Sequence, residues 1–367
     1  MNTLRRFVYR EVIAAVAFVT LGFLALFFFF DLLDELRWVG RSGGTYELSH
    51  ALLFVALGIP SHLYELLPIT VLIGTIYVMA RLAQSSEFTI MRTSGLGPGR
   101  ALRTLLTLGA VFVVVTFAAG DYLAPWSDRM SQLVKARYMG RITTGATGAW
   151  LKERQDDQSY AVNVRAIGPD GGMQNVRIFA FDSQGRLTSQ THAQAARFGS
   201  DGAWTLEQVR RSSFRSRGAD EASVEHLQAP SLRWPTHISA DMVAAAVLKP
   251  DRMATLDLFQ YIRHLEANGQ SAQRYEIEFW RKVFYPLSCL VMVVLALPFA
   301  YLHFRAGGIA GYVFGGVMAG ISFFLLNNVF GYAGNLQNWS PWITAAAPGI
   351  IYSLVSLAAF GWLVLRR

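Results

Sequence analysis

Long apolar segments and polar stretches follow one another along the 367 residues of this chain. A helix that crosses the hydrocarbon core of a bilayer needs about 20 largely apolar residues. Segments of this kind lie at 12–33, 51–80, 104–124, 283–302, 309–331 and 342–365. Three of them precede and three follow one long polar insert. The pattern therefore predicts an α-helical membrane protein with six transmembrane helices, arranged as three plus three.

The first two segments depart from a plain apolar span. The first has an apolar core, from Val12 to Phe30, that is longer than the roughly 7–15 residues of a secretory signal. No small-x-small cleavage site follows it, so we expect an uncleaved anchor. The second contains His62 and Glu65 beside two prolines. We expect one long helix there, kinked or tilted, and its pattern assigns no role to Glu65.

The polar insert has the period of a β-sheet. Residues 176–181 form an apolar run, 182–185 contain a glycine turn signal, and Leu187 begins a returning run. The pattern repeats around 199–202, and 169–172 carry another turn signal. Several short strands at this spacing predict an inserted antiparallel β domain, a sandwich or jelly-roll-like sheet, rather than βαβ units.

The end of the insert is helical by its period. Residues 255–265 repeat apolar positions at helical spacing, with Thr255 as the expected N-cap and Gly269 as the expected stop. The predicted organisation is a first transmembrane half at 1–124, a β domain with a terminal helical linker at 125–281, and a second transmembrane half at 282–367. The β domain could serve as a spacer or could hold an amphiphile, and the pattern leaves both open.

The distribution of charge predicts the orientation in the membrane. The net charge is +8, and arginines gather before the first span, between the second and third, and at the C-terminus. The positive-inside bias therefore places both termini in the cytosol and the insert on the far side. Scattered arginines on two sides of a bilayer are a poor match for nucleic acid, whereas anionic lipid head groups fit them.

Motifs for chemistry are missing from the sequence. There is no phosphate-binding G-x-x-x-x-G-K-[ST] loop, and no Cys/His cluster has metal-ligand spacing. Cys289 is the one cysteine, so no intrachain disulfide forms. The span centres carry almost no ionisable groups, which ion-coupled transporters usually need. We therefore expect no catalytic residues, no cofactor and no metal, and an energy source in a partner.

A short basic loop joins the second and third spans, and residues of about 84–95 are expected to form a helix in it. Ser85 or Ser86 could cap this helix and Gly95 could end it. One interpretation is a capped connector on the membrane surface. The other is a coupling helix that docks on a soluble motor domain. Its contact residues would be Glu87, Arg92 and an exposed apolar pair, Phe88 and Met91.

Basic residues also gather near the outer ends of the first and third spans. Arg37 and Arg41 follow the first span, and Lys135 and Arg137 follow the third. They could anchor the chain at the interface, or they could bind the phosphates of an anionic lipid, for which the arginine fork is well suited. In the fifth span, two G-x-x-x-G spacings indicate close helix packing, and the amides Asn327 and Asn328 fit the same role.

The layout and two local segments resemble the LptF/LptG lipopolysaccharide export permeases. Residues 82–87, running to Met91 and Ser94–Gly95, resemble the coupling segment of that family. The start of the fourth span resembles the LptG side of the family, in Gly269–Gln270, Arg274–Tyr275, Trp280, Lys282, Phe284 and 286–288. The resemblance covers essentially the whole chain.

The resemblance implies a bacterial inner-membrane permease subunit that is not itself an enzyme. It implies a heterodimer with an LptF-like homologue, a cytosolic LptB-like ATPase dimer, and periplasmic LptC-like and LptA-like bridge proteins. The cargo would be lipopolysaccharide, extracted from the membrane and passed on through the β domain.

Carried over to this chain, the family pattern gives three residues a role. Glu87 would face the ATPase, and Arg37 and Lys135 would stand at basic positions for lipid phosphate. Asp31 and Ser61 depart from that basic pattern. The rival hypotheses are a membrane-embedded lipid-modifying enzyme and an envelope scaffold. The first would need clustered acid, base or nucleophilic residues near the bilayer surface, and the second would tolerate charge reversal at Glu87.

Overall fold

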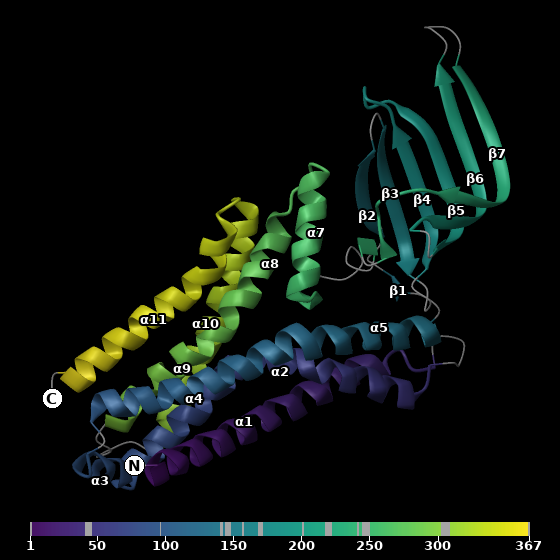
Figure 1. Ribbon diagram of the computed structural model, residues 1–367. Coiled ribbons are helices and arrows are strands. Elements are labelled where there is room, and N and C mark those ends of the chain that lie inside the picture. Colours follow the sequence, from purple (N-terminus) through teal and green to yellow (C-terminus); the bar gives the residue numbers. More distant parts are fainter. Residues whose placement is uncertain are drawn as a thin grey trace. The chain divides into compact units, whose positions relative to one another are not determined.

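Two compact units make up the chain, and Figure 1 shows their elements. The computed structural model describes residues 2–40, 46–95, 97–139, 142–143, 148–155, 158–167, 172–199, 202–216, 222–240, 242–243, 250–301 and 309–365. The helical unit comprises Met1–Asp34, Val55–Ser127 and Glu276–Arg367. The sheet unit comprises Glu35–Phe54 and Asp128–Tyr275.

Helices make up most of the first unit and part of the second. The helices with described bounds are α1 Asn2–Leu36, α2 Leu48–Gln84, α3 Glu87–Thr93, α4 Pro98–Ala118, α5 Ala124–Met139, α7 Thr255–Ala267, α8 Gln273–Phe284, α9 Ser288–Ala296, α10 Ile309–Leu336 and α11 Pro341–Leu365. A π-helical turn, η1 Ala119–Leu123, joins α4 to α5, and short 3-10 turns, η3 Tyr285–Leu287 and η4 Leu297–Tyr301, flank α9.

Six stretches of helix in the described residues are long and apolar enough to cross a membrane. They are Thr3–Leu36, Leu48–Gln84, Pro98–Lys135, Gln273–Tyr301, Ala310–Leu336 and Pro341–Trp362. Each contains most of one predicted segment, so the six-helix membrane prediction is confirmed. The second span is one continuous helix despite Pro60 and Pro68.

Glycines allow the helices of the helical unit to approach one another closely. A Cβ at Gly109 in α4 would lie 2.8 Å from Val293 in α9. On α10, a Cβ at Gly316 would lie 2.6 Å from Ile76, and the spacing Gly316–Gly320 therefore faces α2. The other predicted spacing, from Gly311, meets no atom within 4 Å among the described residues. One of the two G-x-x-x-G spacings thus packs against a neighbouring helix of this chain.

The sheet unit contains one antiparallel sheet. Its strands are β1 Ile142–Thr143, β2 Ala149–Gln155, β3 Gln158–Ile167, β4 Met173–Phe181, β5 Leu187–Phe198, β6 Trp204–Ser216 and β7 Ala222–Trp234. β3 to β7 pair in sequence order, and β1 and β2 both pair with the free edge of β3 (Figure 1). The inserted β domain is confirmed. The described strands form a single meander. Periodicity predicts strands and turns, but it does not say which strands pair.

One face of the sheet is apolar and is covered by the chain that follows β7. Val162, Val176 and Leu206 belong to this buried cluster. The indole nitrogen of Trp204, which is fully buried, donates to the carbonyl oxygen of Ile238 at 2.7 Å. The segment after β7 therefore folds back over the apolar face, and it closes the core of the sheet unit.

The predicted helix at the end of the insert is α7, and its limits differ slightly from the expectation. The N-cap is Ala254, so Thr255 is the first helical residue and the predicted cap is wrong by one position. Gly269 has a φ of 64° just after the helix, as the predicted stop requires. The predicted turn at 169–171 lies outside the described residues, whereas Gly185 has a φ of 77° in the turn between β4 and β5.

Candidate functional site

The short helix α3 lies between the second and third spans, in the helical unit. Ser86 precedes it with a φ of 61°, and its hydroxyl makes no cap hydrogen bond to this helix. Gly95 follows with a φ of 99°, and Pro98 is the first residue of α4. The predicted short helix, its glycine stop and its proline restart are therefore present, whereas backbone geometry rather than a serine cap begins the helix.

One face of α3 packs into the core of the membrane helices. Phe88 is 4% exposed and Met91 is 6% exposed. The Phe88 ring lies edge-on to Tyr301, with the ring centroids 5.1 Å apart. The expectation that Phe88 and Met91 form an exposed docking pair is wrong. Two apolar residues at i and i+3 do form one helix face, but the spacing alone does not say whether that face meets protein or solvent.

The outer surface of α3 carries different residues. Glu87 and Thr89 are exposed, and Ile90 is 62% exposed. The Arg92 guanidinium lies 5.0 Å from the centroid of the Tyr301 ring, which holds it near the inner face. The apolar side chain that α3 offers to solvent is therefore Ile90, beside the carboxylate of Glu87.

The predicted lipid-binding residue Lys135 is engaged inside the sheet unit. Its ammonium lies 3.0 Å from Glu35 Oε2 and 4.0 Å from the centroid of the Phe54 ring. Glu35 is buried, and its other oxygen accepts a hydrogen bond of 2.8 Å from Tyr46. Burial, together with this bond, raises the pKa of Tyr46. The charge of Lys135 is thus neutralised by a residue 100 positions earlier, which sequence spacing could not reveal.

The other predicted lipid-binding residues have different surroundings. Arg37 lies exposed in the turn after α1. Arg41 lies outside the described residues, and Arg137 belongs to α5 with a side chain that is also outside them. The carboxylate oxygen Oδ2 of Asp31 lies 2.6 Å from the ring nitrogen Nε2 of His62. Of the predicted residues whose side chains the structure describes, Arg37 is exposed and Lys135 is paired with Glu35.

Sequence reasoning missed a polar cluster at the start of the fourth span. Arg281 donates to Glu278 at 2.8 Å and to the side chain of Asn328 at 3.0 Å. Lys282 is 6% exposed and donates to the carbonyl oxygen of Gly120 at 2.8 Å. Gly120 lies in the π-helical turn, where the regular helical hydrogen bonding is interrupted. The ammonium therefore satisfies a carbonyl group of this turn.

The chemistry available in these sites is binding and packing. Among the residues that the structure describes, no three His, Cys, Asp or Glu side chains lie together as metal ligands. The sites offer an exposed surface on α3, an exposed arginine after α1, and ion pairs inside each unit.

A sequence model of the lipopolysaccharide export system permeases LptF/LptG matches residues 6–365. The chain belongs to the LptF/LptG family. The match includes both transmembrane halves and the sheet.

Comparison with individual proteins agrees with the LptG side of the family. The chain is 28% identical over 371 aligned positions to the LptG permease of Haemophilus influenzae. It is 26% identical over 369 positions to LptG of Escherichia coli K12. Both alignments cover 100% of this chain and 99% of the relative. Six apolar spans and membership of LptF/LptG identify a multi-pass permease of the inner membrane.

Proposed function

We propose that this chain is the LptG-type subunit of an ATP-driven lipopolysaccharide exporter. The observation that carries the proposal is the family match over 6–365, which spans both membrane halves and the inserted sheet. In the proposed complex, an LptF-like homologue completes the membrane gate and an LptB-like ATPase dimer supplies the energy. LptC-like and LptA-like bridge proteins receive the lipid. Export by the purified chain with no partner and no nucleotide would contradict this proposal.

The proposed contact with the ATPase is the outer surface of α3. The buried Phe88 and Met91 anchor the helix to the membrane core, so a push on α3 is transmitted to the spans. Glu87 and Ile90 are the side chains offered to the partner. A carboxylate beside one apolar side chain suits a groove with a basic rim on the ATPase.

Two substitutions separate the anchoring face from the docking face. Ile90→Asp should weaken ATPase co-purification by about tenfold or more while the thermal stability of the permease is unchanged. Phe88→Ala should instead lower the stability of the permease, because it removes a buried ring. Equal co-purification of the Ile90→Asp and unaltered proteins would exclude α3 as the docking helix.

Charge reversal tests the role of Glu87. Glu87→Lys should abolish ATPase coupling and lipid release from proteoliposomes. Glu47→Lys is the matched control, because it makes the same charge change at an exposed residue outside α3. If both variants export equally well, the carboxylate of Glu87 has no part in coupling.

The proposed lipid contact at the outer end of α1 rests on Arg37. Lys135 is assigned a structural role, because its charge is paired with the buried Glu35. A photocrosslinker at position 37 should trap lipopolysaccharide in an active complex, whereas one at position 135 should not. Crosslinking at 135 alone would reverse the assignment.

The proposed orientation places both termini in the cytosol and the sheet in the periplasm. The chain has one cysteine, Cys289, which is buried, so single cysteines are easily introduced and read. In intact cells, a membrane-impermeant maleimide added after outer-membrane permeabilisation should label Gln190→Cys and not Thr89→Cys. The opposite pattern would invert the topology. Deletion of residues 150–235 should leave insertion intact and stop lipid handover.

A further inference from the structure

The alternation of inward and outward side chains is interrupted on three neighbouring strands of the sheet. Side chains on a strand normally point to the two faces in turn. On β4, both Met173 and Val176 are buried, so two residues, Gln174 and Asn175, separate consecutive inward positions. On β6, two residues likewise separate the buried Leu206 from Val209, and the same occurs on β5.

These interruptions lie at the same level on neighbouring strands. Gln174 pairs with Ala195 on β5, and Ala195 pairs with Glu207 on β6. The next residue on β4, Asn175, has a φ of 53°, and the next on β6, Gln208, has a φ of 49°. Left-handed backbone at a glutamine is unfavourable by about 1–3 kcal/mol and is often retained at functional sites.

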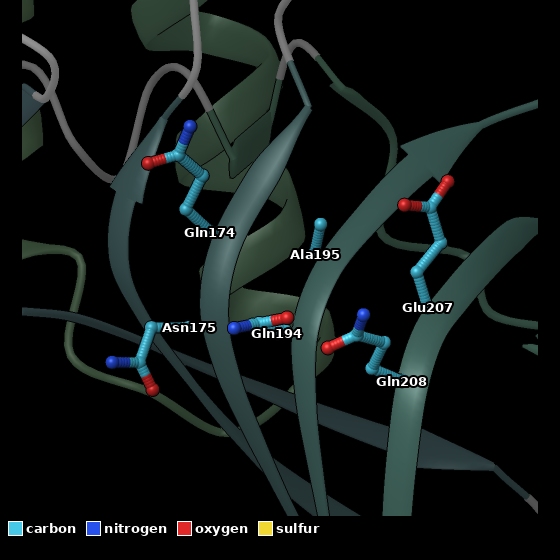
Figure 2. A pocket seen from close by; sticks show the side chains of 6 residues that line it. All are labelled: Gln174, Asn175, Gln194, Ala195, Glu207 and Gln208. Carbon is cyan, nitrogen blue, oxygen red and sulfur yellow. The ribbon is translucent and has the colours of Figure 1, made fainter. Parts of the chain in front are cut away.

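A pocket of about 370 Å³ opens at this level. Its lining comes from three neighbouring strands, as Figure 2 shows, and consists of Gln174, Asn175, Gln194, Ala195, Glu207 and Gln208. We call this the amide pocket. Each amide group offers both donors and an acceptor, and the Glu207 carboxylate, whose Oε1 lies 3.2 Å from Arg197 Nε, only accepts, so the pocket matches ligand groups that both donate and accept, as hydroxyl groups do. Its size falls within the range of small-ligand sites.

On the same face, the next set of cross-strand pairs along the strands carries cationic side chains, and we call this set the basic row. Arg177 pairs across the strands with His192, and His192 pairs with Arg210. Both arginines are exposed, and no carboxylate of the described residues forms an ion pair with either. The ring nitrogen Nε2 of His192 lies 2.9 Å from Asn175 Oδ1, which joins this basic row to the amide pocket.

Arg177 and Arg210 both lie next to His192 on the same sheet face, so an anionic group of a ligand placed there would be attracted by both guanidinium groups. The guanidinium fork suits phosphate and carboxylate groups. An exposed aromatic surface completes the row. Asn163 pairs with both Arg177 and Trp150, and Trp150 is 53% exposed and stacked on Phe179 with centroids 6.0 Å apart.

We propose that this face of the sheet binds an anionic saccharide. The amide pocket hydrogen-bonds its hydroxyl groups, Arg177 and Arg210 bind its phosphate or carboxylate, and Trp150 packs against a sugar ring. The inference rests on the proposed function, since the saccharide would be the carbohydrate part of the exported lipid. It assigns the polar face of the sheet to the sugar of the cargo.

The test measures binding of a lipid-free phosphorylated oligosaccharide, released from lipopolysaccharide by mild acid, to the full chain in detergent. The double variant Arg177→Gln with Arg210→Gln should bind at least about tenfold more weakly. Arg211→Gln is the matched control, because Arg211 pairs with the buried Thr191 and therefore belongs to the opposite face. Equal affinity of the double variant and the unaltered protein would overturn the role of the basic row.

A second pair of variants tests the amide pocket. Gln194→Leu should weaken binding, whereas Gln190→Leu, on the same strand and face outside the pocket, should not. Dephosphorylated oligosaccharide should lose the contribution of the arginines and keep that of Gln194. Inorganic phosphate should compete only weakly, and full competition by phosphate alone would reduce the site to an anion site and overturn the saccharide assignment.

Failure of this inference is distinguishable from failure of the proposed function. Absence of oligosaccharide binding to a complex that still exports lipopolysaccharide would overturn the inference and leave the exporter intact. Saccharide binding by a complex that exports nothing would do the reverse.

Discussion

The helical unit and the polar face of the sheet place their charged side chains in different surroundings. In the helical unit, Arg281 is paired with Glu278 and Lys282 donates to a backbone carbonyl group. On the sheet, Arg177 and Arg210 stand exposed on one face, and no described carboxylate is paired with them. A buried charge without a partner is expensive, whereas an exposed one is solvated at little cost.

Charged side chains that are paired within the chain stabilise the fold. Exposed ones that form no ion pair with a described carboxylate are the candidates for binding a ligand. Lys135 illustrates the first kind, because a buried glutamate already holds it. The arginines of the basic row illustrate the second. Basic composition alone therefore does not locate a binding site, and the partners of each charge have to be known.

The largest expected effect comes from the core of the sheet unit. Trp204→Ala should destabilise this unit by about 3–5 kcal/mol, because it removes a fully buried ring and leaves the Ile238 carbonyl unpaired. Limited proteolysis in the range 142–243 should accelerate, while membrane insertion of the helical unit remains. Trp150→Ala, at an exposed position, is the control. Equal protease sensitivity of both variants would show that the apolar face is not the core of this unit.

A smaller loss is expected at the buried ammonium of the helical unit. Lys282→Met keeps most of the side-chain volume but leaves the Gly120 carbonyl unpaired, so stability should fall by about 1–3 kcal/mol. The melting temperature in detergent gives the measurement. Lys152→Met, on an exposed strand position, should leave it unchanged. An unchanged melting temperature for Lys282→Met would contradict a stabilising role for the hydrogen bond from Lys282 to the Gly120 carbonyl group.

The ion pair of the sheet unit should show coupling between its members. Glu35→Gln leaves the partly exposed Lys135 ammonium without its ion-pair partner and should lower the free energy of unfolding by about 1–2 kcal/mol. Lys135→Met in the Glu35→Gln background should recover part of this loss, which a double-mutant cycle measures. Additive losses would indicate that the two side chains do not interact, and Lys135 would return as a candidate for lipid binding.

The smallest expected effect is a dependence of sheet stability on pH. Burial lowers the pKa of His192, and Arg177 and Arg210 lower it further. The unfolded chain keeps the ordinary value of about 6.5, so it binds a proton first and stability should decrease as pH falls below that value. Burial also lowers the pKa of His264, with the same sign. His192→Gln should therefore remove part of the loss in denaturant midpoint between about pH 8 and about pH 5.5; an unchanged loss would contradict the contribution of His192.

Much of the architecture could be predicted from the sequence because it depends on local patterns. Long apolar segments predict spans, and turn signals around Gly185 predict a hairpin. Pro98 at the first residue of α4 marks a helix start in the same way. Pairing between strands is not local. The sequence therefore did not predict that the described strands, expected as a sandwich or jelly-roll-like sheet, pair as a single meander.

The candidate site was less predictable for the same reason. The helix that contains Glu87 was found by its cap and stop residues, but the face it buries depends on Tyr301. The amide pocket depends on cross-strand neighbours, Gln174, Ala195 and Glu207, which lie far apart in the sequence. No sequence motif marks it.

What the sequence by itself determined is the class of protein: six spans in two groups of three, an inserted antiparallel domain, and a short helix between the second and third spans. Apolar length and turn chemistry act over a few residues, so they are readable along the chain. What only the tertiary structure decided is which polar groups are already satisfied. Glu35 contacts Lys135 across 100 positions and Lys282 contacts Gly120 across 162 positions, and such contacts arise only when the packed chain brings the groups together.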